Sequence, residues 1–524
     1  MKKLIFIFLL VYFTKSYADF IVPKFDPVYE FLEMANTLKL SNLNHLQYPL
    51  YMNDVNIALN SISRNRSAGI YRDIATYHQR RLALNYDLGI QIAVYPATKI
   101  PNSITDIFKN HTQHNRLITI TEKSKNNLNI VYISGILGYN YDVKLIDDDD
   151  FNRTRRYYGI ESVGSFTENF GYYFQFKKGH YFGNEDFIKE NPYLSWMDYG
   201  VYQDGNRFYQ VDLNIELDFK NPFLNISMGY GSFDIGRTIS SSIILNSDVT
   251  PYGYFKFNKR FNIFEYNGIT SQLIPYRRTE PEEYKSKSMA IQTIALNTNQ
   301  ISLGVGNSII YGDRTIDIAY STPLAIYKIM DNKFHGVDNG LAFAFTEYRP
   351  ISGLNIYANI LLDDLTKSRF STENWTSFTA FQGGVITQLS FLPVEIGGEI
   401  TTVGPSTYAH KSQHLTYQQD DMMLGNINGS NFLNIAARTR IHFARCSVLF
   451  YYENIQQGDR GNLLSDNFIQ GEAKFLAGNF ERKELFRTGL DIRLIPELYL
   501  FVNYDYSMTD KETHYIFTGA EFKY

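Results

Sequence analysis

The feature that most constrains the fold is an alternation of apolar and polar side chains that recurs from about residue 81 to the end of the 524-residue chain. In one such run, Leu213 and Ile215 alternate with Asp212 and Asn214, and the same pattern returns near the end at 498–506. Successive side chains of a β-strand point to opposite faces, so this period of two predicts strands with one apolar face and one charged face. We therefore expect a chain that is all-β over most of its length.

A soluble β-sandwich also alternates in this way, with its apolar faces turned inward. Three observations favour a transmembrane antiparallel β-barrel, whose apolar face meets lipid. Several runs reach the about 9–11 residues that a tilted membrane strand needs. They follow one another without helical segments between them, and aromatic side chains gather at strand ends, as in the segment 170–176. The final alternating run also stops on an aromatic residue, Tyr524, as outer-membrane barrels typically do.

The first eighteen residues have the pattern of a targeting segment. Lys2 and Lys3 precede an apolar run from Leu4 to Phe13, and Ala18 ends a small-x-small cleavage pattern. An anchored helix is the alternative, but this run is shorter than the about 20 residues of a membrane-spanning helix. We predict a cleaved secretory signal over residues 1–18 and localisation in an outer membrane of the Gram-negative type.

A short helical region is expected between the signal and the strands. Asp26 and Pro27 predict a helix start, with apolar residues recurring at helical spacing from Val28. A second start follows at Asn53, and a third, weaker pattern includes Ile70. Helices this short must bury their apolar stripes against one another or against something larger. The predicted organisation is therefore a helical unit over residues 19–80 and a barrel over residues 81–524.

Four blocks of sequence resemble the Wzi family of capsule assembly proteins. They occur in the family's order and cover most of the mature chain. The residues that carry the resemblance are Val28-Tyr29-Glu30-Phe31-Leu32 with Tyr48-Pro49-Leu50; Gly229-Tyr230-Gly231, Ile235-Gly236-Arg237-Thr238, Leu245 and Pro251-Tyr252; Tyr311-Gly312-Asp313-Arg314, Tyr320, Pro323-Leu324, Asp338-Asn339, Tyr357 and Leu362-Asp363-Asp364; and Thr407-Tyr408-Ala409-His410, Tyr417, Leu424-Gly425 and Gly429.

The resemblance implies a barrel of about 18 strands whose periplasmic mouth is plugged by the N-terminal helical bundle. It also implies a lectin-like function, in which the protein binds extracellular or capsular polysaccharide and helps to assemble or anchor it at the cell surface. The implied partners are outer-membrane lipid, the polysaccharide and the barrel-assembly machinery during biogenesis. A monomer is expected.

The best candidate for sugar contact is one polar segment of the C-terminal block. Sugar binding uses aromatic faces for the apolar side of a pyranose ring, with carboxylates and imidazoles around it for the hydroxyls. The segment supplies Tyr408, His410, His414, Tyr417, Asp420 and Asp421. A solvated extracellular loop without any ligand is the competing interpretation, because loops are generally polar.

Other functions find little support in the sequence. No HExxH, GxSxG or phosphate-cradling motif is present, so we expect neither an enzyme nor a cofactor. The run Asp147–Asp150 lacks the spaced ligands of a calcium loop and is better interpreted as a charged loop, and a single cysteine, Cys446, excludes a multi-cysteine metal site. A net charge of −4 gives no support for nucleic-acid binding. The alternative that remains is an outer-membrane porin or gated transporter for small solutes.

Overall fold

The computed structural model describes residues 22, 26–41, 50, 52–82, 89–92, 118–123, 128–147, 149–167, 169–190, 208–221, 223–275, 286–334, 336–363, 379–461, 474–495, 497–509 and 511–523. The predicted signal over residues 1–18 lies outside these ranges. None of the helices within them combines the length and apolarity needed to span a bilayer.

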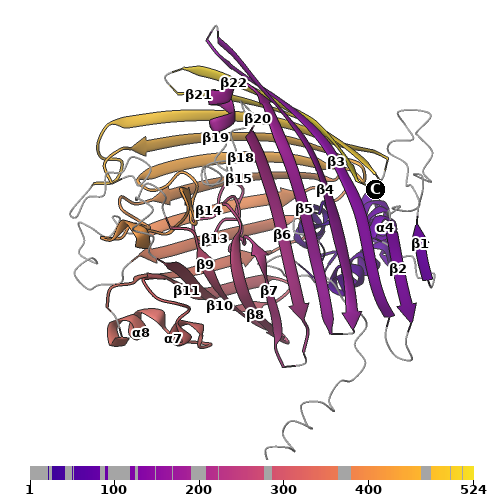
Figure 1. Cartoon of the computed structure of the whole chain (residues 1–524), viewed down its shortest axis with the longest axis horizontal. Helices are drawn as coiled ribbons and strands as arrows, with labels where there is room; N and C mark the ends of the chain where they lie inside the picture. Colours follow the sequence, from indigo (N-terminus) through magenta and orange to yellow (C-terminus); the bar gives the residue numbers. More distant parts are fainter. Residues whose placement is uncertain are drawn as a thin grey trace, which may run out of the picture.

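Eighteen strands among the described residues form a closed antiparallel barrel, as predicted (Figure 1). They are β3 Leu128–Ile146, β4 Asp149–Thr167, β5 Phe170–Gly183, β6 Phe208–Phe219, β7 Asn225–Gly231, β8 Tyr252–Phe261, β9 Phe264–Leu273, β10 Lys287–Asn297, β11 Ile301–Gly312, β12 Asn339–Tyr348, β13 Leu354–Asp363, β14 Thr379–Gln388, β15 Val394–Val403, β18 Phe432–His442, β19 Cys446–Gly458, β20 Phe480–Ile495, β21 Leu498–Met508 and β22 Glu512–Lys523.

The last strand closes the barrel on the first. β22 pairs antiparallel with β3, from Thr513 opposite Ile146 to Lys523 opposite Ile136. The part of β3 before Ile136 continues beyond the barrel and pairs with β2 (Ile118–Lys123), which in turn pairs with β1 (Gly89–Ile92). The closure removes the free edges that a sheet of this size would otherwise expose.

The two ends of the barrel differ in the length of their connections. One end, here called the short-turn end, carries tight connections such as 262–263 and 298–300. The other, the long-loop end, carries connections such as 232–251, 313–338 and 404–431. Short turns face the periplasm in outer-membrane barrels, and longer loops face the outside.

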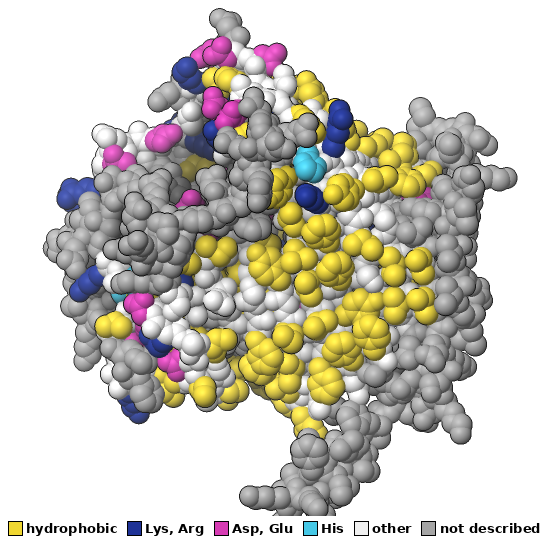
Figure 2. All heavy atoms as spheres, in the orientation of Figure 1, with side chains coloured by type: hydrophobic (Ala, Val, Ile, Leu, Met, Phe, Trp, Pro, Cys, Tyr) yellow, Lys and Arg dark blue, Asp and Glu magenta, His cyan; other side chains and the backbone are white. Residues whose placement is uncertain are grey.

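The strands place charge in the lumen and apolar side chains outside, as the alternation predicts. On β6, Asp212 pairs with Arg155 at 2.6 Å and Glu216 pairs with Lys256 at 3.0 Å across the inner wall. The intervening Leu213 and Ile215 point the other way, and the outer face of the strands is a broad apolar surface (Figure 2). This is the inverse of a soluble sandwich and fits a lipid-facing exterior.

Three N-terminal helices pack at the short-turn end. They are α2 Val28–Thr37, α3 Met52–Arg64 and α4 Ile70–Leu82, with a 3-10 turn, η1, at Arg66–Ala68. Asp26 accepts a hydrogen bond from the backbone N–H of Val28 at 2.9 Å, which supports the predicted start of α2. The prediction that strand-like alternation begins near Leu82 is wrong, because α4 continues through that residue. The helix carries Asp73 in its first turn and Arg80 in its last turn, charges that complement the helix dipole.

The helices bury their apolar stripes against one another and against the inner wall. Their shared cluster includes Ile130 and Tyr132 of β3. Hydrogen bonds tie them to the short turns: Gly353 donates to the carbonyl of Thr37 at 2.9 Å, and the Tyr71 hydroxyl donates to that of Leu392 at 2.6 Å. The wall and the short turns therefore complete a core that the three helices cannot build alone.

Candidate functional site

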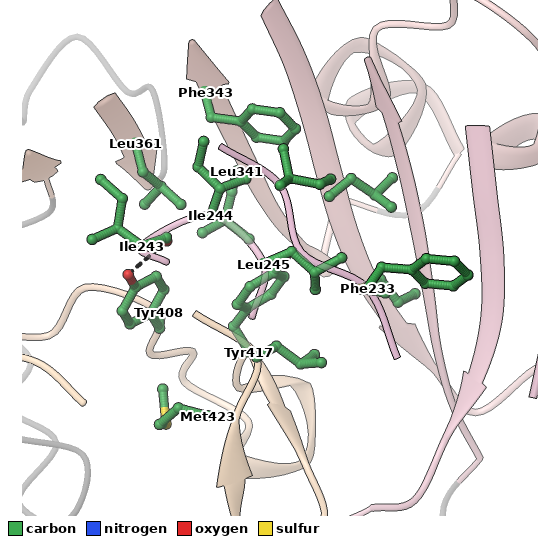
Figure 3. Close-up of a cluster of buried hydrophobic side chains, with 14 of the residues drawn as sticks. Phe233, Ile243, Ile244, Leu245, Leu341, Phe343, Leu361, Tyr408, Tyr417 and Met423 are labelled. Carbon is green, nitrogen blue, oxygen red and sulfur yellow. Dashed lines mark hydrogen bonds between the residues drawn. The ribbon is translucent and has the colours of Figure 1, made fainter. Parts of the chain in front are cut away.

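Two segments from the long-loop end fold into the lumen and form an apolar core there, here called the lumen core (Figure 3). The first segment is 232–251, between β7 and β8, and the second is 404–431, between β15 and β18. The segments contribute Phe233, Ile235, Ile243, Ile244, Leu245, Val249, Tyr408, Leu415, Tyr417, Met423 and Leu424, which pack against inward-facing residues of the wall such as Phe343 and Leu361.

One carboxylate of the wall holds the first segment in place. Glu399 of β15 accepts hydrogen bonds from the backbone N–H groups of Ile239 at 2.8 Å and Ser240 at 3.1 Å. The Tyr357 hydroxyl donates to the same carboxylate at 2.7 Å, so both of its oxygens are engaged. Bonds to a charged acceptor are stronger than neutral ones, and this arrangement fixes the backbone of the segment to the barrel wall.

The second segment is fixed both to the wall and to the first segment. Asp363 of β13 accepts from the backbone N–H of Tyr408 at 2.8 Å, and the Tyr408 hydroxyl donates to the carbonyl of Ile243 at 2.7 Å (Figure 3). Asn246 adds a side-chain bond to the carbonyl of Met423 at 2.7 Å. The two segments therefore form one packed unit inside the lumen.

The two tyrosines of the predicted sugar site lie inside this unit. Tyr408 is 0% exposed and Tyr417 is 1% exposed, and their rings stack on each other with centroids 5.9 Å apart. Burial raises the pKa of both phenols. Neither ring offers the open face that stacking on a sugar requires, because the apolar surface that suits a sugar ring is already covered by protein.

The carboxylates and imidazoles of the same site separate into buried and accessible groups. Asp420 is buried, and its backbone N–H donates to the carbonyl of Ile274 at 3.0 Å. Asp421 is exposed, and His410 and His414 are partly exposed. His414 Nε2 lies 3.6 Å from a carboxylate oxygen of Asp313, which belongs to the neighbouring connection. The accessible residues His410, His414 and Asp421 are here called the outer rim, and sugar binding by the six residues stays a prediction.

Two side chains that hold the first lumen segment in place were not predicted from the sequence. Glu399 had a visible signal, a carboxylate at a lumen position of an alternating strand, but many such positions exist. Arg237 belongs to one of the blocks that resemble the Wzi family, and the structure brings it within 2.9 Å of Glu33 on α2 and within 3.7 Å of Glu395 on β15. The first segment of the lumen core is thereby joined to the N-terminal helices.

The charged run at Asp147 was predicted to be a loop, but Asp149 and Asp150 are the first residues of β4. Asp147 lies in the turn between β3 and β4 and pairs with Lys511 at 3.0 Å, while Arg153 pairs with Asp142 at 2.7 Å. Within the described ranges, no group of three or more acidic, histidine or cysteine side chains is arranged to hold a metal ion.

Comparison with known proteins identifies a fold. No protein-family model and no curated protein sequence matches the chain. The structure resembles that of Wzi from Escherichia coli, an outer membrane protein involved in group 1 capsule assembly that is described as a carbohydrate-binding β-barrel. The two share 11% identity, with 96% of this chain and 99% of Wzi covered and a TM-score of 0.61. This likeness confirms the predicted fold, which is that of Wzi.

Two further solved structures with a weaker likeness are those of OpdO and OpdQ from Pseudomonas aeruginosa. OpdO is 10% identical and OpdQ is 8% identical. Each covers 75% of this chain with a TM-score of 0.44, and 97% of OpdO and 98% of OpdQ are covered. Scores of this size support no further comparison of sites.

Proposed function

We propose that this outer-membrane β-barrel binds extracellular polysaccharide at its long-loop end and anchors it at the cell surface, without catalysing a reaction. The observation that carries the proposal is the lumen core. A pore for free diffusion gains nothing from two long-loop segments that are packed and hydrogen-bonded across its interior. A binding protein gains a rigid platform at its outer surface.

The outer rim is the part of this platform that a polymer can reach. The Asp421 carboxylate can accept hydrogen bonds from sugar hydroxyls, and the imidazoles of His410 and His414 can donate or accept them. Each such bond is weak at an exposed position, so repeated contacts along a chain must supply most of the affinity. The carbohydrate binding described for Wzi, which has the same fold, also supports the proposal.

The test uses full-length protein in detergent micelles and surface polysaccharide purified from the organism's own cells. We expect binding to long chains, little binding to short oligosaccharides, and about tenfold weaker binding in a His414→Ala, Asp421→Ala variant, equivalent to about 1.4 kcal/mol. The matched control is Asp149→Ala with Lys511→Ala, which changes two charged residues at the same end but outside the outer rim. Equal binding by both variants would exclude the rim, and no binding by the native protein would reject the function.

Gated transport is the second candidate, and one feature favours it. The inner wall formed by β3 to β6 and β22 is lined by ion pairs, including Lys177 with Glu521 at 2.6 Å, and not by the apolar side chains of the lumen core. A polar wall suits a hydrated path for small solutes. Conductance of the native protein in planar bilayers, together with reduced solute uptake in cells that lack it, would favour this alternative.

A further inference from the structure

One long connection does not fold into the lumen. Residues 313–338 join β11 to β12 and contain α7 (Ile318–Ser321) and α8 (Tyr327–Phe334), and Figure 1 places both helices outside the wall of strands. The connection is here called the outer hairpin. It binds Gln292 of β10, whose side-chain oxygen accepts from the Leu324 N–H at 2.9 Å. Gln292 faces outward, because the adjacent Ile291 faces the lumen core.

The exposure of side chains on the outer face of β11 shows where the hairpin covers the barrel. Alternate residues Ile301, Leu303 and Val305 point outward, and Val305 is 54% exposed. Further along the same face, Ile309 and Tyr311 are both 0% exposed because the hairpin lies over them. The hairpin therefore covers one end of an outward face that is open at the other end of the same strand.

The covered surface lies near the outer edge of the apolar band. At about 3.3 Å per residue and a tilt near 45°, the step from Ile301 to Tyr311 rises about 23 Å along the barrel axis. The apolar band of an outer-membrane barrel is about 25 Å tall. The hairpin thus sits at the height of the outer lipid leaflet, where a barrel normally shows an aromatic girdle.

The inner side of the hairpin is rigidly packed. Tyr320 and Tyr327 pack with Tyr311 of the strand, and the Tyr320 hydroxyl donates to Asp338 at 2.7 Å. Asp338 also forms an ion pair with Arg314, whose guanidinium lies 4.9 Å from the centre of the Tyr311 ring. Tyr311, Arg314, Tyr320 and Asp338 all belong to the third block that resembles the Wzi family. These residues of the block therefore hold the hairpin against the barrel.

The side that faces away from the barrel is apolar. Ile318 is 83% exposed and Leu324 is 64% exposed, and the other large apolar side chains that are open there are Ile316, Ile326, Ile329 and Val337. An exposed cluster of this kind on one small element marks a surface with a partner. This cluster continues the lipid-facing surface that Leu303 and Val305 form on the strand beneath.

We propose that the outer hairpin is a lipid-docking element, whose apolar side inserts among the acyl chains of the outer leaflet beside β10 and β11. Continuity with the lipid-facing band selects lipid over other occupants, because a bilayer that surrounds the barrel at this height must also surround the hairpin. The element then behaves as an interfacial amphipathic helix that is fastened to a barrel wall. The inner side of the hairpin covers the strands in place of lipid. Its outer side presents a new apolar surface to the surrounding lipid.

The proposal is tested by the depth of single fluorescent labels in the full-length protein. Each label is attached to one introduced cysteine in a Cys446→Ser background, and the protein is inserted into phosphatidylcholine vesicles. The vesicles carry a nitroxide either near the head group or near the end of the acyl chain. Ile318→Cys is the test position, Leu303→Cys is the lipid-facing control, and Lys411→Cys, at an exposed residue of the second lumen segment, is the aqueous control.

We expect the label at residue 318 to be quenched by lipid nitroxide, most strongly by the one near the head group, and to be protected from iodide in water. The label at residue 411 should behave in the opposite way. Quenching of the residue 318 label by iodide alone would overturn the proposal. Cross-linking of that cysteine to a second copy of the chain in vesicles would overturn it too, because the apolar side would then be an interface between barrels.

Discussion

The guanidinium of Arg237 lies 2.9 Å from the carboxylate of Glu33, and the two residues come from opposite ends of the barrel. Arg237 belongs to the segment that enters from the long-loop end, and Glu33 lies on α2 at the short-turn end. This ion pair, partly shielded from solvent, therefore joins the lumen core to the N-terminal helices.

The first prediction tests this connection. Glu33→Gln should weaken docking of the helices by about 1 kcal/mol, which is below the range of about 1.5–3 kcal/mol for hydrogen bonds to charged groups, because both side chains retain some exposure. Amide hydrogen exchange in α2 should accelerate accordingly. Asp73→Asn, which removes an exposed partner of Arg72, is the control and should leave exchange unchanged. An identical exchange rate in both variants would show that the pair does not couple the two ends.

The second prediction concerns the helices as a plug. Deleting residues 19–82 should leave a barrel that inserts into membranes, because the strands that close it begin after α4. The deletion should raise single-channel conductance in planar bilayers, since the helices pack at the short-turn end. Circular dichroism of the purified variant should still show β structure. Failure to insert, or conductance equal to that of the full-length protein, would contradict the role of the helices as a plug.

The third prediction concerns the lipid-facing strands. Leu213→Arg and Ile215→Arg should each impair assembly by about 2–4 kcal/mol, because they place a charge near the middle of the bilayer. Asn214→Arg should be tolerated, since its side chain faces the lumen close to Asp212 and Glu216. The heat-modifiable mobility of folded barrels on gels measures the assembled fraction. Similar folded fractions for all three variants would argue against a lipid-facing exterior.

The fourth prediction concerns the lumen core. Tyr408→Ala should destabilise the second segment by about 3–5 kcal/mol, because it removes a fully buried ring that stacks on Tyr417. Tyr408→Phe keeps the ring but loses the bond to the Ile243 carbonyl, and should cost about 1–3 kcal/mol. Limited proteolysis of intact cells measures the opening of the segment. Equal resistance of the alanine variant and the native protein would mean that the ring is not part of a packed core.

The fifth prediction concerns pH and the buried imidazole of His78. Burial and the neighbouring Arg81 hold the pKa of His78 well below its usual range, so the folded helices favour the neutral ring. This contribution to stability is complete above the ordinary pKa of about 6.5 and is lost as pH falls below it, by about 1.4 kcal/mol per pH unit. Protease sensitivity of the helices should therefore rise between pH 7 and pH 5.

The carboxylate of Glu30 on α2 can be excluded as the source of that effect. Burial opposes ionisation of Glu30, but Arg440 and His442 nevertheless lower its pKa to about 2. Its stabilising charge is therefore present above its usual pKa and disappears only as pH falls towards 2. His78→Gln should flatten the response between pH 7 and pH 5, whereas His410→Gln at the outer rim should retain it. A response that persists in His78→Gln would assign the effect to another group.

Much of the barrel could be predicted because its signal is local. Alternation along β6 separates Leu213 and Ile215 from Asp212 and Asn214 by parity alone, and the structure places them on opposite faces. The short amphipathic segments likewise predicted α2 and α3, because helical spacing is a property of neighbouring residues. The predicted boundary between the helices and the strands near Leu82 was wrong, since a run of alternating residues can also lie at the end of a helix whose last turn is basic.

The sequence by itself determined which strand faces meet lipid, because a period of two assigns every residue of a strand to one side. Only the tertiary structure decided which connections fold inward and which fold outward. Tyr408 is buried because Ile243, 165 residues earlier, supplies a partner within the lumen, and Tyr320 is buried because β11 supplies Tyr311 on the outside. Each segment contains two tyrosines, so their tyrosine content cannot separate them. Whether each segment folds into the lumen or onto the outside depends on contacts between residues far apart in the chain, and no local sequence pattern predicts such contacts.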